Sequence, residues 1–369
     1  MLPDPRPYLA DLDDPRRQTK NKLHALGDIV FIVLCAVLSG IEDWVGMEDF
    51  AQEKQDWLRT FIELPNGIPS HDTLSDVLGR IKPDQFTQLF TRWVEAALPT
   101  LAGEHVAIDG KTLRGSRDGE GTVHLMSAFA SRARWVLTQR AVREKTNEIT
   151  AIPELLSLLD LRGATVTIDA IGCQKTIAAQ LTTAGADYVL SLKENQPALH
   201  GDVKLFLDTE VNAGKLTTLK TLDKDHGRVE TRRYWLSDRL DWLAARSSWD
   251  GLKAVGLVES VREIGGKMST ERRYFLSSVT DLESFAHTVR AHWSIENQEH
   301  WVLDVQFGED ANRARKDHSA ANLALIRRMS LNLLRRNGTD KRSLRSRKLR
   351  AALSDDYRAR LLSGGETST

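Results

Sequence analysis

The chain has 369 residues, and its 51 basic and 51 acidic side chains cancel, so no global field of one sign favours nucleic acid. With 41% hydrophobic and 28% charged residues, the composition is that of a folded globular protein of roughly two or three domains. It excludes a disordered or membrane-embedded chain. Cys35 and Cys173 are too few for a disulfide framework or a thiolate zinc site.

Two features of the sequence bear on location. The amino terminus is polar and lacks the apolar stretch of a signal peptide. The longest apolar run, residues 29–38, is about half of the ~20 residues that span a bilayer. We therefore expect a cytoplasmic protein with no membrane partner.

The first hundred residues carry a helical pattern. After a charged, Pro-rich arm over 1–24, aromatic residues recur at helical spacing, and we interpret them as core. Asp28 is expected to cap a helix that Gly40 ends, and Ser70 or Asp72 to cap a later one. The sequence predicts an all-helical amino-terminal domain.

The pattern changes to α/β near residue 106. A short apolar strand there ends at Asp109, and a second β-branched strand ends at Asp169. The predicted order is strands over 106–110, 122–130 and 133–142, a helix over 152–161, a strand over 164–170, a helix over 176–184 and a strand over 187–192. This order predicts an antiparallel meander followed by alternating helices and strands in a mixed sheet.

Residues 197–280 predict a β-rich insertion, with strands over 228–236, 254–262 and 272–278. Two helices follow, one around 290–304 and an amphipathic one over 319–336, and residues 364–369 are expected to be disordered. The predicted domains are 1–100 (helical), 101–200 (catalytic, first part), 201–280 (insertion), 281–340 (catalytic, second part) and 341–369 (basic tail, partly disordered).

The helix around residues 290–304 carries polar side chains at i, i+4 spacing. Read as an α-helix, it places His292, Glu296, His300 and Asp304 on one face. A metal stripe of the zinc-protease kind needs two histidines four residues apart, and these are eight apart, which disfavours a zinc hydrolase. Alone, the stretch is equally consistent with an ordinary surface helix.

The two aspartates at the ends of the predicted strands favour a functional role for that helix. In open α/β sheets, functional residues gather at the carboxyl ends of strands, so Asp109 and Asp169 meet if their strands are parallel neighbours. Adding Glu296 makes three carboxylates, whose mutual repulsion requires a cation. Oxygen ligands in small number suit Mg²⁺, and paired ions suit the hydrolysis of a phosphodiester.

Basic residues favour a phosphate-containing partner. Residues 313–350 hold 13 Lys or Arg and two Asp, which is typical of a phosphate-binding surface or of a solvated helix face. Lys111 and Arg114 follow the first strand without a Walker pattern, so they either contact a DNA backbone or are exposed cations in a turn. Arg228 and Arg232 share a strand face with Glu230, a pattern that fits either DNA contact or a cross-strand ion-pair face.

Several motifs together resemble one family. They are VAIDGKTLRGS (106–116), TIDAIGCQ (167–174), HWSIEN (292–297) followed by HWVLDV (300–305), LPNGIPSHDT (64–73), YVLSLKENQ (188–196) and HGRVE (226–230). They are similar to the signatures of DDE transposases of the ISAs type, a group that includes the H-repeat-associated proteins. The resemblance covers roughly residues 5–350.

This resemblance implies an RNase H-like catalytic fold with a β-rich insertion, preceded by the helical domain. It implies that Asp109, Asp169 and Glu296 form a metal-binding catalytic triad for Mg²⁺ or Mn²⁺, with two ions. Related transposases place Tyr, Arg and Lys around the Glu, where this chain has Val289, His292 and Leu303. We expect His292, Arg290 and Lys193 to contact DNA together with Lys111, Arg114 and Arg228.

The sequence therefore predicts a transposase of a bacterial insertion sequence, acting in the cytoplasm on the nucleoid. It would hydrolyse phosphodiesters at terminal inverted repeats and transfer the 3′-hydroxyl to target DNA, as a homodimer during synapsis. One alternative is a catalytically inactive or domesticated DNA-binding relative. Another is a stand-alone nuclease, which would cut without a preference for transposon ends.

Overall fold

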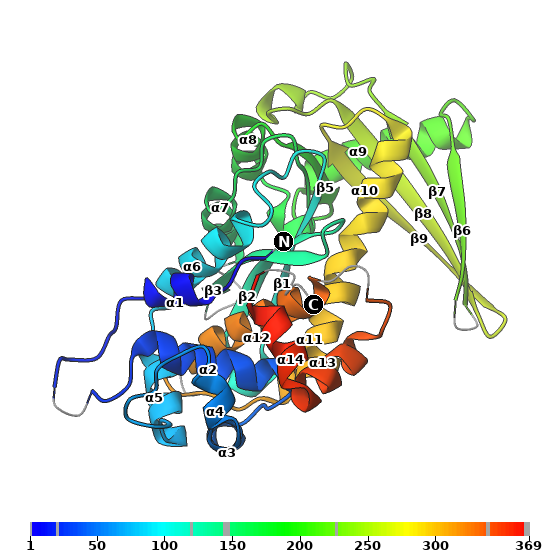
Figure 1. Ribbon diagram of the computed structural model, residues 1–369. Coiled ribbons are helices and arrows are strands. Elements are labelled where there is room, and N and C mark those ends of the chain that lie inside the picture. The colour runs from blue at the N-terminus through cyan, green and yellow to red at the C-terminus, as the bar shows by residue number, and fades with distance from the viewer. Residues whose placement is uncertain are drawn as a thin grey trace. The chain divides into compact units, whose positions relative to one another are not determined.

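The computed structural model of the chain describes residues 2–19, 22–118, 121–142, 148–225, 228–336 and 340–364 (Figure 1). The chain forms two compact units. The first unit comprises Met1–Thr100, Gly110–Leu159 and Glu296–Thr369, and the second comprises Leu101–Asp109 and Asp160–Ile295. The boundary between Asp109 and Gly110 falls inside one strand, β1 (His105–Thr112).

The amino-terminal part of the first unit is helical. Its helices are α1 (Arg6–Ala10), α2 (Leu26–Leu38), α3 (Trp44–Glu53), α4 (Gln55–Leu58), α5 (His71–Arg80) and α6 (Pro83–Glu95). The hydroxyl of Ser70 accepts from the Thr73 N–H at 3.3 Å, which confirms Ser70 as a cap. The prediction that Asp28 caps α2 is wrong, because buried Leu26 extends the helix and leaves Asp28 in its first turn.

The rest of the first unit surrounds helix α12 (Ser319–Arg335). The other elements are strands β2 (His124–Ala130) and β3 (Trp135–Val142), which pair antiparallel as predicted, and helices α7 (Glu148–Ser157), α11 (Trp301–Phe307), α13 (Leu344–Leu353) and α14 (Asp355–Leu362). Helix α12 contacts α2, α5, α6 and β3. The prediction that it is amphipathic is wrong: all residues from Ser319 to Leu334 are buried, because neighbours cover its whole circumference.

The basic segment after residue 340 forms α13 and α14, which the sequence analysis did not assign. Both helices begin at serine caps. The Ser343 hydroxyl accepts from the Ser346 N–H, and the Ser354 hydroxyl from the Tyr357 N–H. The disorder expected for residues 364–369 lies, beyond residue 364, outside the described residues.

The second unit is built on a twisted mixed sheet. From the first part of β1, its strands follow in the order β1, β4 (Thr165–Ile168), β5 (Asp187–Leu192), β9 (Lys267–Ser277), β8 (Ala254–Ile264), β7 (Arg228–Ser237) and β6 (Leu219–Asp225). Strands β1, β4 and β5 are parallel, and the remaining pairs are antiparallel. The helices of this unit are α8 (Lys175–Thr183), α9 (Pro197–Asn212) and α10 (Leu282–Ser294).

The predicted strands of this region are confirmed, although β9 begins at Lys267, five residues before the predicted start, whereas β6 and α9 were missed. β6 reads Leu-Lys-Thr-Leu-Asp-Lys-Asp, which is too polar for an apolar strand pattern. Among the described residues, no helix is long and apolar enough to cross a membrane.

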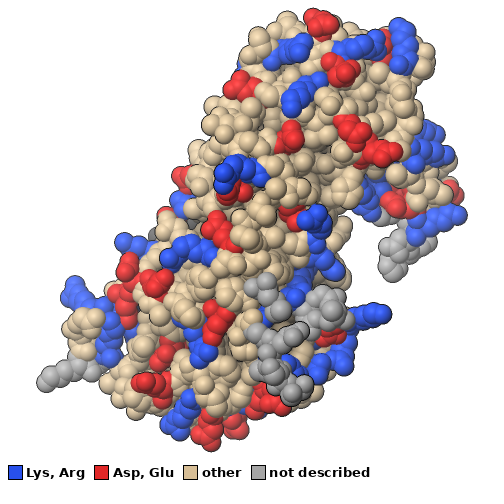
Figure 2. Space-filling model, turned by 45° about the horizontal axis from the view of Figure 1, so that its top comes forward, with Lys and Arg blue, Asp and Glu red and all other residues tan. Residues whose placement is uncertain are grey.

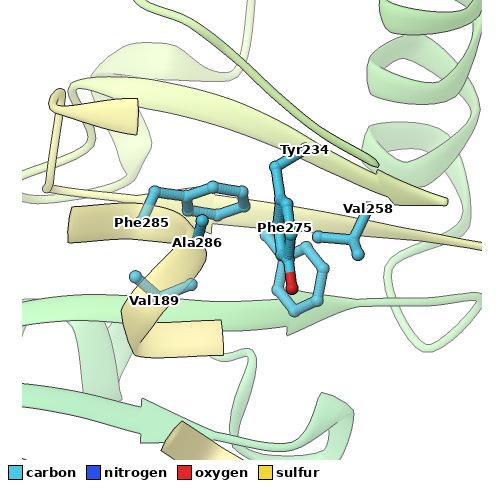
Figure 3. Close-up of a cluster of buried hydrophobic side chains, with 6 residues drawn as sticks. All are labelled: Val189, Tyr234, Val258, Phe275, Phe285 and Ala286. Carbon is cyan, nitrogen blue, oxygen red and sulfur yellow. The ribbon is translucent and has the colours of Figure 1, made fainter. Parts of the chain in front are cut away.

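Helix α10 packs against β4, β5 and β7 through aromatic side chains. Figure 3 shows Phe285 and Ala286 from this helix gathered with side chains from the sheet, namely Val189, Tyr234, Val258 and Phe275. Phe275 and Phe285 meet edge to face with ring centroids 5.7 Å apart. Gly256 on β8 lies under the Phe285 ring, where a Cβ atom would be 2.3 Å from Phe285 Cζ. The absent side chain at residue 256 therefore makes room for the aromatic anchor of α10.

We predict that Gly256→Ala destabilises the protein by about 1–3 kcal/mol, because the added methyl group displaces the Phe285 ring from a filled core. Gly201→Ala on α9 is the matched control. Nothing lies within 4 Å of a Cβ there, so the substitution should be neutral or slightly stabilising. Chemical denaturation of both variants measures the difference, and equal stabilities would contradict this account of Gly256.

Candidate active site

The two predicted aspartates directly follow the paired residues of neighbouring parallel strands. The prediction that the first strand ends at Asp109 is wrong, because β1 continues to Thr112. β1 and β4 are in register, with Ile108 opposite Ile168, so Asp109 and Asp169 are the next residues at the same edge of the sheet. Buried apolar side chains precede both carboxylates, and the aspartates themselves are half-buried. The Asp169 carboxylate accepts from the Ile171 N–H at 3.1 Å, which caps the short 3₁₀ turn Ala170–Gly172. The second unit thus brings Asp109 and Asp169 together.

Behind these aspartates, three side chains join β1, β4 and α10. The Thr167 hydroxyl lies 2.8 Å from His105 Nε2 and 2.8 Å from His292 Nδ1. Burial lowers the pKa of His105 to about 3, aided by the nearby His292 and His287. Burial, with a contribution from Arg273, lowers the pKa of His292 to about 4. Both imidazoles are therefore neutral at pH 7, and His292 is half-buried beside Thr167.

Glu296 lies in the first unit, at the start of a π-helical turn. This turn, Ile295–His300, joins α10 to α11. The prediction of one α-helical face through His292, Glu296, His300 and Asp304 is wrong, because the wider turn breaks the i, i+4 spacing. Glu296 is exposed, whereas Glu299, one residue before His300, is completely buried. π-Turns inside helices occur frequently at functional sites.

A buried ionic cluster lies in the first unit, and we call it the Lys111–Arg328 cluster. It consists of Lys111, Glu299, Asp304, Glu309 and Arg328. The Arg328 guanidinium donates from Nε to Glu299 and from Nη1 to Glu309, both at 2.9 Å. The Lys111 ammonium contacts Asp304 and lies 3.1 Å from Glu309. Although burial raises it, the pKa of Glu309 falls to about 2, because Arg328 and Lys111 outweigh the burial.

This cluster corrects two expectations about basic residues. Lys111 was predicted to contact DNA, but it is buried and its ammonium group is engaged by carboxylates. Residues 313–350 were predicted to present one phosphate-binding surface, but Arg327 and Arg328 are buried. A sequence shows the charge of an arginine but not the carboxylate that receives it. Glu299 and Glu309 gave no signal, because isolated acidic residues near a helix are common.

The other predicted DNA contacts are placed differently. Arg114 is exposed and lies 3.4 Å from Asp310. Arg290 is exposed and lies 3.6 Å from Asp223. The side chain of Arg228 lies outside the described residues. On the face that Figure 2 shows, Lys and Arg are interspersed with Asp and Glu, as the balanced composition leads one to expect.

Lys193 lines a pocket of about 530 Å³ in the second unit, beside Asp169. The pocket begins at Ala170 and Ile171, directly after that aspartate. Two further cations line it, but Arg272 is held by Glu259 and Asp208, and Arg273 by Glu271. The exposed Lys193 follows the last residue of β5. The lining residues are Ala170, Ile171, Ser191, Leu192, Lys193, Glu194, Asn195, His200, Glu271, Arg272, Arg273 and Tyr274.

Comparison with known proteins identifies the family of the chain. A family model described as a transposase DDE domain matches residues 101–333, and the model of the domain associated with it matches residues 7–94. The chain belongs to the DDE transposase family.

Relatives of this DDE family member include proteins of the H-repeat group. It is 40% identical over 359 residues to the candidate transposase YncI of Escherichia coli O157:H7, and the alignment covers 95% of this chain and 92% of the relative. It is 38% identical over 363 residues to the H repeat-associated candidate transposase YhhI of Escherichia coli K12, covering 95% and 96% of the two chains.

A third relative, encoded in the region 3′ of dhlA in Xanthobacter autotrophicus, is 50% identical over 285 residues, which are 76% of this chain and 96% of the relative. A solved structure of the piggyBac transposase synaptic complex with hairpin DNA aligns with a TM-score of 0.44 and 11% identity. That alignment covers 96% of this chain and 77% of the other.

We predict that acid destabilises the protein through the two buried histidines. Their pKa values lie below 6.5 in the folded state, so the unfolded chain binds more protons as the pH falls. Stability is therefore retained above pH 6.5 and lost between pH 6.5 and about 4, by up to about 1.4 kcal/mol per pH unit for each histidine. His105→Gln, which keeps a partner for Thr167, should make this loss shallower in denaturation measurements at pH 7 and 5.

His71→Gln is the control of opposite sign. The hydrogen bond to Glu48 raises the pKa of His71, so its protonation stabilises the folded state as the pH falls through the raised value. Removing it should steepen the acid loss. A His105→Gln protein with the acid profile of the wild type would contradict the assignment of His105.

Proposed function

We propose that the protein is the transposase of a bacterial insertion sequence, which hydrolyses phosphodiesters at the element's ends and transfers the strand to target DNA. The observation that carries this proposal is the pair of aspartates that follow the last paired residues of adjacent parallel strands, in a chain of the DDE family. We propose further that the catalytic fold is RNase H-like. The chain order supports this, since a hairpin of β2 and β3 follows β1, and β4 and β5 are parallel to β1.

We infer that Asp109, Asp169 and Glu296 form the catalytic triad and hold Mg²⁺ or Mn²⁺, as a pair of ions. Among the described residues, no three His, Cys, Asp or Glu side chains are grouped closely enough to bind a metal. Two adjacent half-buried carboxylates nevertheless fit a hard cation. Mg²⁺ prefers oxygen ligands and is usually bound by one or two carboxylates, with water or substrate in its other coordination positions. The chemistry that such ions supply is activation of a water or a 3′-hydroxyl and stabilisation of the leaving oxygen.

The residues around this site suit an anionic substrate. His292 is neutral at pH 7 and adds no positive charge that would oppose binding of a metal cation. We propose that Lys193, Arg114 and Arg290 contact the DNA backbone, since all three are exposed. Lys111 is omitted from this set because it is buried and ion-paired.

We propose the predicted domain roles for the remaining regions. Residues 1–100 would bind the terminal inverted repeats, residues 201–280 would be an insertion in the catalytic domain, and two copies would pair during synapsis. Because the substrate is chromosomal DNA, the protein would act at the nucleoid in the cytoplasm.

Asp109→Asn and Asp169→Asn should each reduce cleavage at the transposon ends by at least on the order of 10³-fold, because metal-ion catalysis supplies several kcal/mol. End binding, measured by gel shift, should be retained. The control is Asp160→Asn, in an exposed ion pair with Arg162 ahead of β4, which should cleave normally. Full cleavage by either strand-end variant would refute the site.

The same excision assay separates the alternatives. With the element's inverted repeats and Mg²⁺, an inactive DNA-binding relative would bind the ends without releasing the element. A stand-alone nuclease would cut DNA without preference for these ends and without joining. Only the proposed transposase both releases the element and joins it to a target.

Replacing Lys193 or Arg114 with Met should weaken DNA binding and reduce the slope of log K against log salt by about 0.9, the contribution of one phosphate contact. The double variant should lose about twice that slope. Arg162→Met is the control, because Arg162 is exposed and paired with Asp160, before β4 rather than at its carboxyl end. Binding isotherms at several salt concentrations measure the slope, and an unchanged slope in the double variant would exclude both contacts.

A further inference from the structure

The Lys111–Arg328 cluster touches two segments that carry proposed metal ligands. Lys111 is two residues after Asp109 on strand β1, so both side chains leave the same face of that strand. Glu299 belongs to the π-helical turn that also holds Glu296, three residues earlier. The ionic contacts among the cluster members all lie within the first unit. The cluster is therefore a physical connection between the end of β1 and the turn that bears Glu296.

The connection is continuous from one segment to the other. The Lys111 ammonium binds Asp304 on α11 and Glu309 just beyond it, at 3.1 Å in the latter case. Glu309 shares its other oxygen with Arg328 at 2.9 Å, and Arg328 reaches Glu299 at 2.9 Å. The side chains of Arg328, Glu299 and Glu309 have no exposed surface. These three side chains are thus held by partners that water does not replace.

Close backbone packing also holds the segment that follows β1 against the chain beyond α11. Gly115, at the end of the segment that follows β1, lies against Asn312, where a Cβ atom would be 2.0 Å from the Asn312 carbonyl oxygen. The Arg315 side chain donates to the Gly115 carbonyl at 2.9 Å. Gly110 is equally confined, since a Cβ there would lie 2.5 Å from His124 Nε2. The end of β1 therefore has little freedom to move while the cluster is intact.

A buried ionic cluster is a poor way to gain stability alone, because desolvation offsets most of the attraction. Such a cluster does fix the positions of its members, since a buried charge is stable only where an opposite charge pairs with it. Ligands of a metal ion need such support, and loss of a supporting group typically weakens metal binding by 10–100-fold.

We propose that the Lys111–Arg328 cluster is an internal clamp that positions the strand end after Asp109 and the π-turn of Glu296, and so sets how the carboxylates bind metal. Lys111 and Asp304 are positioning residues in this proposal, with no contact to DNA. The proposal rests on the function proposed above, because it presumes that Asp109 and Glu296 are metal ligands.

The test is calorimetric titration of the purified protein with Mn²⁺ alone, which needs no turnover. Lys111→Met and Asp304→Asn should each weaken Mn²⁺ binding by about 10–100-fold, while Lys111→Arg, which keeps the charge, should restore much of the affinity. Gel shift with end DNA in the presence of EDTA should show unchanged DNA binding, since the clamp does not touch the substrate. Arg162→Met, which breaks an exposed ion pair, should leave Mn²⁺ binding as in the wild type.

Two further comparisons keep the outcomes separate. The Asp304 side chain is 34% exposed, so Asp304→Asn decides the question if Lys111→Met does not fold. Folded Asp304→Asn protein with wild-type Mn²⁺ affinity would overturn the clamp. If Asp109→Asn also left Mn²⁺ binding unchanged, the metal site itself, and with it the proposed function, would fail. If Asp109→Asn weakened binding while the clamp variants did not, only the clamp would fail.

Discussion

The first unit depends on the buried guanidinium of Arg328. Arg328 belongs to α12, and its side chain has no exposed surface. It binds Glu299 and Glu309, which are equally buried. Removing one partner of such a group leaves an uncompensated charge in the interior, which costs about 3–5 kcal/mol. Neither the π-turn nor the segment after α11 can therefore shift without breaking an ionic contact. The position of Glu296 follows from this constraint, because Glu299 and Glu296 share the same turn.

The second unit solves a related problem with uncharged groups. The Thr167 hydroxyl can donate one hydrogen bond and accept two, so it can bond to both neighbouring imidazoles at once. Burial lowers the pKa of both rings and keeps them neutral at pH 7. Strands β1 and β4 and helix α10 are joined in this way directly behind Asp109 and Asp169. The sheet edge that presents the aspartates is thus supported by a polar contact as well as by apolar packing.

Much of this arrangement could be predicted from the sequence. Asp109 and Asp169 were visible because β-branched, apolar runs stop at these polar residues, and the parallel pairing of β1 with β4 is confirmed, although β1 itself continues to Thr112. The cap at Ser70 was visible for a similar local reason. The site around Glu296 was only partly predictable. Glu296 itself could be identified, but the π-turn could not be predicted. The spacing was interpreted at 3.6 residues per turn, which already assumes a regular α-helix.

The misses share a physical cause. Arg327, Arg328 and Lys111 were taken for surface cations because charge usually means exposure. The burial of Arg328 and Lys111 depends on pairing with carboxylates from other elements. Helix α12 was taken for amphipathic because its polar residues suggest a wet face. That face is covered by α2, α5 and α6, with Asn322 donating to the carbonyls of Leu78 and Ile81. Partners contributed by distant segments produce no periodic pattern in the local sequence, so these contacts could not be predicted from it.

The π-turn also determines which sequence changes this region can accept. A π-turn contains one residue more than the α-helical turn it replaces, and each residue turns an α-helix by about 100°. Deleting one residue between Ile295 and His300 would tighten the turn into an α-helix and change the angles at which the remaining side chains of the turn leave the helix axis. Substitution at exposed Asn297 would leave the winding intact. The number of residues in this turn is therefore under tighter constraint than the identity of most of them, and relatives should vary there by replacement rather than by insertion or loss.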